Sequence, residues 1–141
     1  MAILEDKIDI QASQELVWKE TIEVESWPLW SPAMERIVRE DSGDFKLGSS
    51  ILIKQKLMPE TQWVVTEFNP GHSFSWKARS LGIHMVASHL LTPCDSGVTS
   101  VLKFEMKGVV AKLLWPLLKK QVLQALKEEN YGLKQFCESR S

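Results

Sequence analysis

The sequence has few cysteines, almost no net charge and no long apolar run. Its two cysteines, Cys94 and Cys137, are too few for a disulfide scaffold and lack metal-ligand spacing, so we expect free thiols in a reducing cytoplasm. Seventeen basic residues against eighteen acidic ones leave a formal charge of −1, without the basic excess of a nucleic-acid-binding protein. No apolar run approaches the ~18 residues of a membrane span, and residues 1–10 lack the pattern of a signal peptide. These absences argue against a disulfide-rich, nucleic-acid-binding or membrane-spanning protein and favour the cytoplasm.

Motifs for metal, nucleotide or nucleophilic chemistry are also missing. His72, His84 and His89 have no spacing that would place two metal ligands on one face of an element. The seven glycines are scattered at turns, so the sequence holds no phosphate-binding loop. Neither cysteine lies near a base in sequence, which leaves a thiol mechanism without support. The sequence therefore indicates no metal and no cofactor.

Tryptophan, in contrast, is abundant. The six tryptophans are Trp18, Trp27, Trp30, Trp63, Trp76 and Trp115. A chain of 141 residues with 44% apolar residues can bury a continuous core without disulfides. No internal repeat, low-complexity tract or linker divides the chain. We therefore expect one aromatic-rich domain over residues 1–141.

The first 32 residues predict a strand followed by short helical segments. Ile8 and Ile10 alternate with polar neighbours, as in a half-buried strand. Ser13 has the character of a helix N-cap, and the acidic Glu15 in the first turn complements the helix dipole, so we expect a short helix over residues 13–20. The two prolines of segment 26–32 exclude regular structure for long, because each removes a donor and restrains the residue before it.

From Met34 onward the apolar residues recur with a period of two, which predicts strands with one dry face. The dry positions are Ile51, Ile53 and Leu57 in one strand, Phe74, Trp76 and Ala78 in another, and Leu102, Phe104 and Met106 in a third. Turn residues lie at 41–43, 58–59, 69–71 and 95–97. Short connections of this kind indicate an antiparallel meander, because parallel strands need longer crossovers.

The end of the chain changes to a helical period. From Val110 onward most apolar residues fall on one stripe of a helix. The stretch from Pro116 to Cys137 alone would extend roughly 33 Å, and Pro116 should start this helix or kink it after a short lead-in. The pattern therefore predicts an α+β fold in which a curved antiparallel sheet wraps around a long C-terminal helix. A space between sheet and helix would suit an apolar ligand.

Several motifs add a family resemblance to this layout. They are Ile8-x-Ile10-x-Ala12-x-x-Glu15-x-Val17-Trp18, Trp27-Pro-x-Trp30-x-Pro32, Trp63-x-Val65-x-Glu67-x-x-Pro70, Gly97-x-Thr99 and Gly132-Leu133-Lys134-x-x-x-Glu138. Together, in this order over nearly the whole chain, they resemble the SRPBCC superfamily of START-like and pollen-allergen-like helix-grip proteins, in its polyketide cyclase/dehydrase and lipid-transport branch. The resemblance implies the helix-grip fold, with two short helices after the first strand.

The resemblance also implies a ligand class. Members of the superfamily bind hydrophobic molecules between helix and sheet, including lipids, sterols, polyketides and quinones, and some are cyclases or dehydratases. The superfamily has no shared catalytic signature to transfer. This chain differs from the usual pattern in having His89 where an aromatic residue often stands.

The candidate ligand-binding residues are those that the pattern turns toward the space between sheet and helix. They are Trp30, Gln55, Trp63, Trp76, Met85, His89, Phe104, Leu118 and Val122. A hairpin at residues 70–71 would pair Val65 with Trp76 and Glu67 with Phe74, and would point Trp63 and Glu67 inward unless a bulge reverses them. We expect the mouth near residues 27–32, Pro59 and residues 69–72.

Glu67 and His89 are the candidates for acid–base catalysis, and Glu129 lies inside the apolar stripe of the long helix. Each has an alternative interpretation. Glu67 could be a surface group beside a turn, Glu129 could lie where the helix overruns the sheet, and Gln55 could lie at a strand end in water. His89 could be a core histidine with satisfied hydrogen bonds.

Two functions from different classes follow, and the sequence leaves open whether the protein is an enzyme. The first is carriage or sequestration of a hydrophobic small molecule, and the second is polyketide cyclase or dehydratase chemistry in the same cavity. A role in protein interaction, as in a chaperone cofactor, is a third possibility. A carboxylate within hydrogen-bond reach of His89 would favour catalysis, whereas a purely apolar cavity would favour carriage. The identity of the ligand and the oligomeric state cannot be inferred from the sequence.

Overall fold

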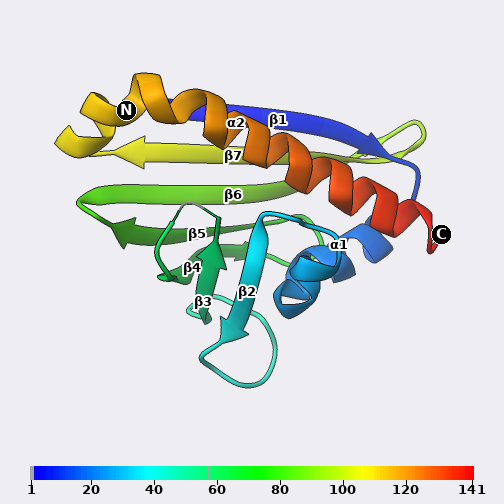
Figure 1. Ribbon diagram of the computed structural model, residues 1–141. Coiled ribbons are helices and arrows are strands. Elements are labelled where there is room, and N and C mark those ends of the chain that lie inside the picture. Colours follow the sequence, from blue (N-terminus) through cyan, green and yellow to red (C-terminus); the bar gives the residue numbers. More distant parts are fainter. Residues whose placement is uncertain (1, 57) are drawn as a thin grey trace.

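The computed structural model describes residues 2–56 and 58–141. Its strands are β1 (Ala2–Ile10), β2 (Met34–Arg39), β3 (Ser50–Gln55), β4 (Thr61–Asn69), β5 (Ser73–Ser80), β6 (Ile83–Cys94) and β7 (Gly97–Lys107). Within the described residues they form one antiparallel sheet in the order β1-β7-β6-β5-β4-β3-β2. Figure 1 shows this sheet curving behind a long C-terminal helix, α2 (Val109–Glu138), which confirms the predicted α+β helix-grip fold.

The inner face of the sheet is the dry face that the alternation predicts. Ile51, Ile53, Phe74 and Trp76 are all at most 2% exposed, and they belong to one core cluster. Leu57, which the alternation places on the same face, lies outside the described residues. The period of two therefore identifies the inner face correctly wherever the strands are regular.

The turn between β5 and β6 is one that the sequence analysis does not anticipate. Leu81 and Gly82 connect the two strands with φ angles of 53° and 77°, so both residues lie in the left-handed region. Two positive φ values form the mirror-image turn that matches the twist of a hairpin. Leucine rarely adopts this region, so of the two turn residues only Gly82 is of a type that suits it.

Two short helices follow β1, as expected. Helix α1 (Gln14–Ile22) begins after Ser13, whose hydroxyl accepts a hydrogen bond from the Leu16 N–H at 3.1 Å, so the predicted N-cap is confirmed. The helix ends two residues later than expected. It leads into the 3₁₀ helix η1 (Val24–Leu29), which contains Pro28. Segment 26–32 is thus partly helical, but only in a short and tight form.

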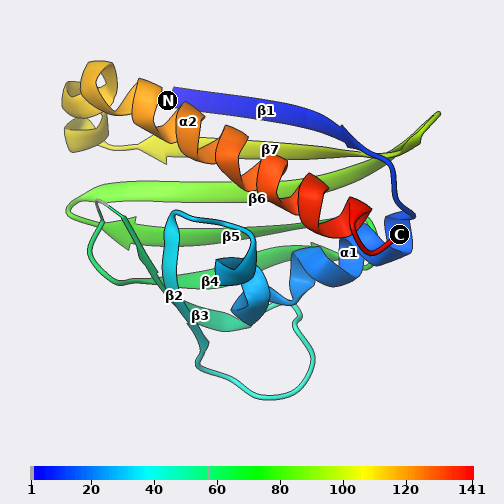
Figure 2. The same cartoon turned by 45° about the vertical axis from the view of Figure 1, so that its right-hand side comes forward.

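Helix α2 has 30 residues and continues through Pro116 instead of starting there. A lead-in of seven residues precedes the proline, and Figures 1 and 2 show the first part of α2 at an angle to the rest. A kink at this position agrees with the effect of proline inside a helix. No helix in the described part of the chain is long and apolar enough to cross a membrane.

The C-terminal part of α2 is fixed to the sheet by a buried asparagine and a close backbone approach. Asn130 is fully buried, accepts a hydrogen bond from the Ser100 hydroxyl at 2.9 Å and donates one to the Asp6 carboxylate at 2.8 Å. Gly132 lies so near Trp30 that a Cβ would overlap the Trp30 carbonyl oxygen. These contacts fix the distance between α2 and the sheet. They thereby determine how much space is left between the middle of the helix and the sheet.

Candidate ligand cavity

A cavity of about 630 Å³ lies between the inner face of the sheet and α2. Side chains from β3 to β7, η1 and α2 line it, together with the β3–β4 loop. Its apolar wall includes Trp27, Trp63, Trp76, Met85, Phe104 and Leu118. The volume lies within the roughly 300–1,000 Å³ that is typical of small-molecule sites. The space that the sequence analysis predicts between sheet and helix is therefore present and is not filled by the protein's own side chains.

Most of the residues predicted from the sequence lie in this cavity. Those that line it are Gln55, Trp63, Trp76, Met85, His89, Phe104, Leu118 and Val122. Glu129 also lines the cavity, so it does not project beyond the sheet. Gln55 is half-buried at the wall, which excludes the alternative that it stands fully in water. Whether these residues bind a ligand stays a prediction.

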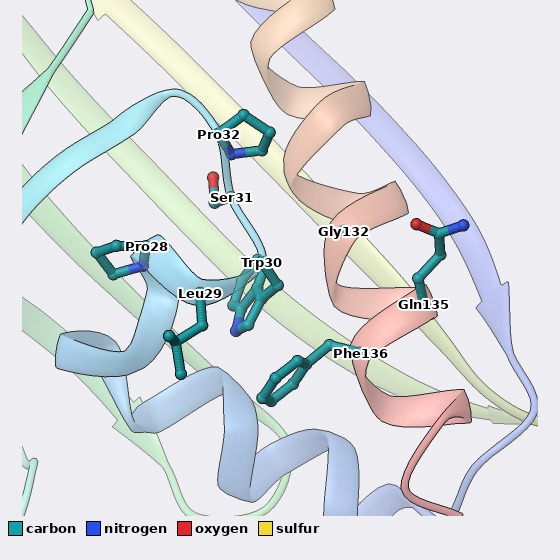
Figure 3. Close-up of a pocket in the computed structure, with 8 residues that line it drawn as sticks. All are labelled: Pro28, Leu29, Trp30, Ser31, Pro32, Gly132, Gln135 and Phe136. Atoms are coloured by element: carbon teal, nitrogen blue, oxygen red, sulfur yellow. The ribbon is translucent and has the colours of Figure 1, made fainter.

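Trp30 does not line the large cavity. It lies at a second, surface hollow of about 380 Å³ between η1 and α2, shown in Figure 3, where its ring and that of Phe136 flank the opening. Trp27, three residues earlier, points into the large cavity in its place. Because segment 27–32 is irregular, no period in the sequence tells which of the two tryptophans points inward.

Glu67 points to solvent, which agrees with the alternative of a surface group beside a turn, and the inward direction expected from an unbulged hairpin is wrong. Val65 pairs with Trp76 as expected, but a bulge between Val65 and Glu67 shifts the register, and Glu67 pairs with Ser75. The extra residue turns the Glu67 side chain outward, where it is exposed. Glu67 is thereby excluded as a catalytic residue of the cavity.

The prediction of where the cavity opens is only partly correct. Pro59 lines the cavity, but the loop of residues 69–72 does not. That loop contacts α1 instead, where the Gln14 side-chain amide donates a hydrogen bond to the Gly71 carbonyl at 2.8 Å. Exposed lining residues such as Pro59 and Leu81 mark the opening at the end of the sheet where α2 begins.

His89 and Glu129 meet inside the cavity. His89 projects from β6 and Glu129 from α2, and His89 Nε2 lies 3.4 Å from Glu129 Oε2. Both side chains are largely buried, with 8% and 13% of their surface exposed. A carboxylate at this distance contributes to the orientation of the imidazole. The sequence marks each residue as inward, but it gives no sign that they pair.

Aromatic rings enclose the imidazole on several sides. The Phe74 ring, directly opposite on β5, stacks on it with an interplanar angle of 8° and a centroid distance of 4.5 Å. Trp27 lies at 5.2 Å, and Trp76 presents an edge-to-face contact at 5.7 Å. The rings restrict His89 to one orientation and exclude water from its faces.

Two buried nitrogen atoms in the cavity wall have no hydrogen-bond partner among the described residues. They are His89 Nδ1 and Trp63 Nε1. An unsatisfied buried donor or acceptor costs about 1–3 kcal/mol. Both atoms are covered even against a molecule as small as water, so a ligand in the cavity does not contact them unless neighbouring side chains move.

The cysteines take no part in this site. Both are free, and neither lines the cavity. Cys137 is fully buried at the end of α2, and burial raises the pKa of its thiol to about 12. A thiol with such a pKa stays protonated at neutral pH and is a poor nucleophile.

Comparison with known proteins agrees with the fold and the cavity. A family described as "Polyketide cyclase / dehydrase and lipid transport" matches residues 1–138. Among curated proteins no sequence matches the chain.

Solved structures share the fold at low sequence identity. The hypothetical protein jhp0584 from Helicobacter pylori superposes with a TM-score of 0.84 at 14% identity, over 96% of this chain and 88% of that one. The di-domain ARO/CYC protein StfQ from the steffimycin biosynthetic pathway has a TM-score of 0.82 at 15% identity, and the match covers 98% of this chain but 51% of StfQ. A Thalictrum norcoclaurine synthase mutant, in complex with a transition-state analogue, has a TM-score of 0.70 at 16% identity, over 99% and 96% of the two chains.

Proposed function

Because the chain belongs to the polyketide cyclase/dehydrase and lipid-transport family, we propose that it binds a hydrophobic small molecule, such as a lipid, polyketide or quinone, in the cavity between the sheet and α2. The observation that carries this proposal is the volume of about 630 Å³ enclosed by apolar side chains. Burying an apolar molecule there removes its surface from water at roughly 25 cal/mol per Å². Met85 and Met106 on the wall are flexible enough to adapt to ligands of different shape.

The polar atoms of the wall select among hydrophobic molecules. Gln55, Ser88 and Gln121 place polar side chains in the otherwise apolar wall. These side chains suit an apolar molecule that carries a carbonyl or hydroxyl group better than a pure hydrocarbon of the same size.

Fluorescence tests the binding directly, because Trp27, Trp63 and Trp76 all line the cavity. A long-chain quinone should quench the tryptophan emission of the full chain saturably. Ala125→Leu adds three carbons to the cavity wall and should weaken binding at least tenfold. Lys127→Leu, an exposed position of α2 outside the cavity, is the matched control and should bind as the wild type does. Unchanged emission with quinones, fatty acids and polyketides would overturn the proposal.

The His89–Glu129 pair supports a second candidate function, acid–base catalysis on the bound molecule. His89 Nε2 and Glu129 Oε2 lie 3.4 Å apart in a buried site, and an imidazole beside a carboxylate is a pair of groups that general-base catalysis uses. Two structural neighbours, the ARO/CYC protein and norcoclaurine synthase, are named for reactions. In this candidate function His89 takes a proton from the carbon beside a ligand carbonyl and returns it, while Glu129 holds the imidazole in place.

Deuterium exchange distinguishes carriage from catalysis. A long-chain methyl ketone in D₂O should gain deuterium beside its carbonyl faster with the wild type than without it, if His89 acts as a base. His89→Gln should abolish this acceleration and keep binding within a few-fold, and Glu129→Gln should reduce it. A wild type that binds the ketone without accelerating the exchange would leave carriage as the function.

A further inference from the structure

The first part of α2 exposes apolar side chains that the binding cavity does not use. Val109, Leu113 and Leu117 are 72–76% exposed, and their spacing of four residues places them on one face of the helix. Leu81, in the β5–β6 turn, is 77% exposed. With two half-shielded neighbours they form a patch that we call the apolar tip. It consists of Leu81, Val109, Val110, Leu113, Leu114 and Leu117.

The members of the apolar tip lie together although they come from distant parts of the chain. A Cβ on Gly82 would touch the Val110 side chain at 3.4 Å, and one on Gly108 would lie 3.0 Å from the Gly82 carbonyl oxygen. The β5–β6 turn therefore sits against the start of α2. Figures 1 and 2 both show these two segments at the end of the molecule opposite the C-terminus.

The apolar tip also borders the cavity. Leu81 and Leu114 belong to both, and Leu118, one turn further along α2, lines the cavity wall. A ligand that leaves the cavity at this end passes directly over the apolar tip.

The charged residues of the segment that carries most of the apolar tip have one sign. Residues 106–127 contain five lysines and no aspartate or glutamate, although the whole chain carries a charge of −1. These lysines are Lys107, Lys112, Lys119, Lys120 and Lys127, all of them exposed. Within the described residues none of them takes part in a salt bridge. Their charge is thus available to an external partner.

We propose that the apolar tip and its lysines dock the protein onto an anionic lipid bilayer, with the cavity opening toward the membrane. Protruding leucines beside lysines, with the half-buried Trp115 in the same segment, are typical of helices that lie in a membrane interface. Lysine is depleted at protein–protein interfaces, which argues against a protein partner. A symmetric pairing of two copies through this surface would bring the lysines of both copies together. The docking itself is argued from these side chains alone. Only the direction in which the cavity opens, toward the membrane, rests on the proposed function.

Vesicle sedimentation with the full chain tests the docking. The wild type should sediment with vesicles of phosphatidylcholine and phosphatidylglycerol, less with phosphatidylcholine alone, and less at high salt. Leu113→Ser combined with Leu117→Ser should weaken the partition coefficient at least tenfold. Lys112→Gln combined with Lys119→Gln should weaken it about fivefold per lysine on anionic vesicles and leave neutral ones unaffected.

Matched controls use the same residue types elsewhere on the surface. Leu29→Ser with Leu47→Ser removes two leucines that are 73% and 61% exposed, and Lys46→Gln with Lys77→Gln removes two exposed lysines. Neither pair should change vesicle binding. A wild type that does not sediment, or an equal loss in the controls, would overturn the proposal. A dimer that Leu113→Ser and Leu117→Ser dissociate would overturn it in favour of an interface between two copies.

Different variants test the docking and the proposed ligand binding, so a failure of one proposal can be distinguished from a failure of the other. Ala125→Leu, which fills the cavity, should sediment with vesicles as the wild type does. Leu113→Ser with Leu117→Ser should keep the quenching by a quinone in solution, because neither leucine lines the cavity.

Discussion

The first half of α2, residues 109–121, buries only Ala111, whereas the second half, residues 122–138, buries Asn130, Leu133 and Cys137. Both halves carry apolar side chains at helical spacing, so the sequence pattern does not separate them. They differ in what lies opposite. The second half faces β1 and Trp30, but the first half extends to the end of the sheet beside the β5–β6 turn, where Val109, Leu113 and Leu117 are exposed in the part of the chain that the structure describes.

This difference shows which part of the helix is packed into the fold and which part presents apolar side chains to the outside. Burial and the Asn130 hydrogen bonds hold the second half in place, and Glu129, near its middle, reaches the cavity. Exposed leucines in the first half contribute little to stability. Apolar patches of this kind mark interaction sites in other proteins. The comparison therefore predicts that substitutions at the buried positions of the second half affect folding, whereas those at the exposed leucines of the first half affect docking onto a partner surface.

The largest effect is expected from Gly132→Ala. Alanine favours helix by up to about 1 kcal/mol over glycine, but its Cβ would overlap the Trp30 carbonyl oxygen. We expect a net loss of about 3 kcal/mol in the free energy of unfolding, measured by urea denaturation. Lys119→Ala in the first half is the control and should change stability by less than about 0.5 kcal/mol. A Gly132→Ala variant as stable as the wild type would show that the second half is not held against Trp30.

The sequence predicts the regular elements of this molecule well, because their periods follow directly from burial on one face. His89 and Glu129 are both placed correctly as inward residues, the first by strand parity and the second by helical spacing. Their contact at 3.4 Å is not predictable. It depends on how high α2 lies above the sheet, which the Asn130 and Gly132 contacts determine between residues far apart in the chain.

The predictions that the structure contradicts concern residues in or beside irregular backbone. Glu67 follows a bulge that no residue type announces, so one extra residue in β4 reverses its direction. Trp27 and Trp30 lie in a segment without a period, and the wrong one is expected in the cavity. The exposed leucines of residues 109–121 continue the apolar stripe of the buried half, and only the end of the sheet distinguishes them.

A smaller, pH-dependent effect is expected at Glu138, at the end of the second half. Its carboxylate accepts hydrogen bonds from the Gln11 backbone N–H at 2.8 Å and from Lys134 at 2.6 Å, and these partners lower the pKa of Glu138. Since the folded state favours the ionised form, the stabilisation is present above the carboxyl's unfolded pKa and is lost as the pH falls through the lowered, folded one. Glu138→Gln should therefore melt at a lower temperature than the wild type at neutral pH.

The difference in melting temperature should shrink as the wild-type carboxylate becomes protonated, and melting curves of both proteins from neutral to acidic pH measure it. Glu128→Gln, an exposed glutamate of α2 without a backbone partner among the described residues, serves as the control. A difference at Glu138 that persists unchanged in acid would show that the ionised form is not what binds the second half to β1.

The smallest effect is expected from Leu117→Ala, and it makes the sharpest test of the comparison. Leucine and alanine have similar helix propensities, and Leu117 is 72% exposed, so the free energy of unfolding should change by less than about 0.5 kcal/mol. The same substitution in the second half, Leu133→Ala, removes a side chain that is 4% exposed and should cost about 3 kcal/mol. Urea denaturation of both variants under one condition compares the halves directly. If Leu117→Ala cost as much as Leu133→Ala, the first half would be part of the folding core in solution, and its leucines would not be available to a membrane.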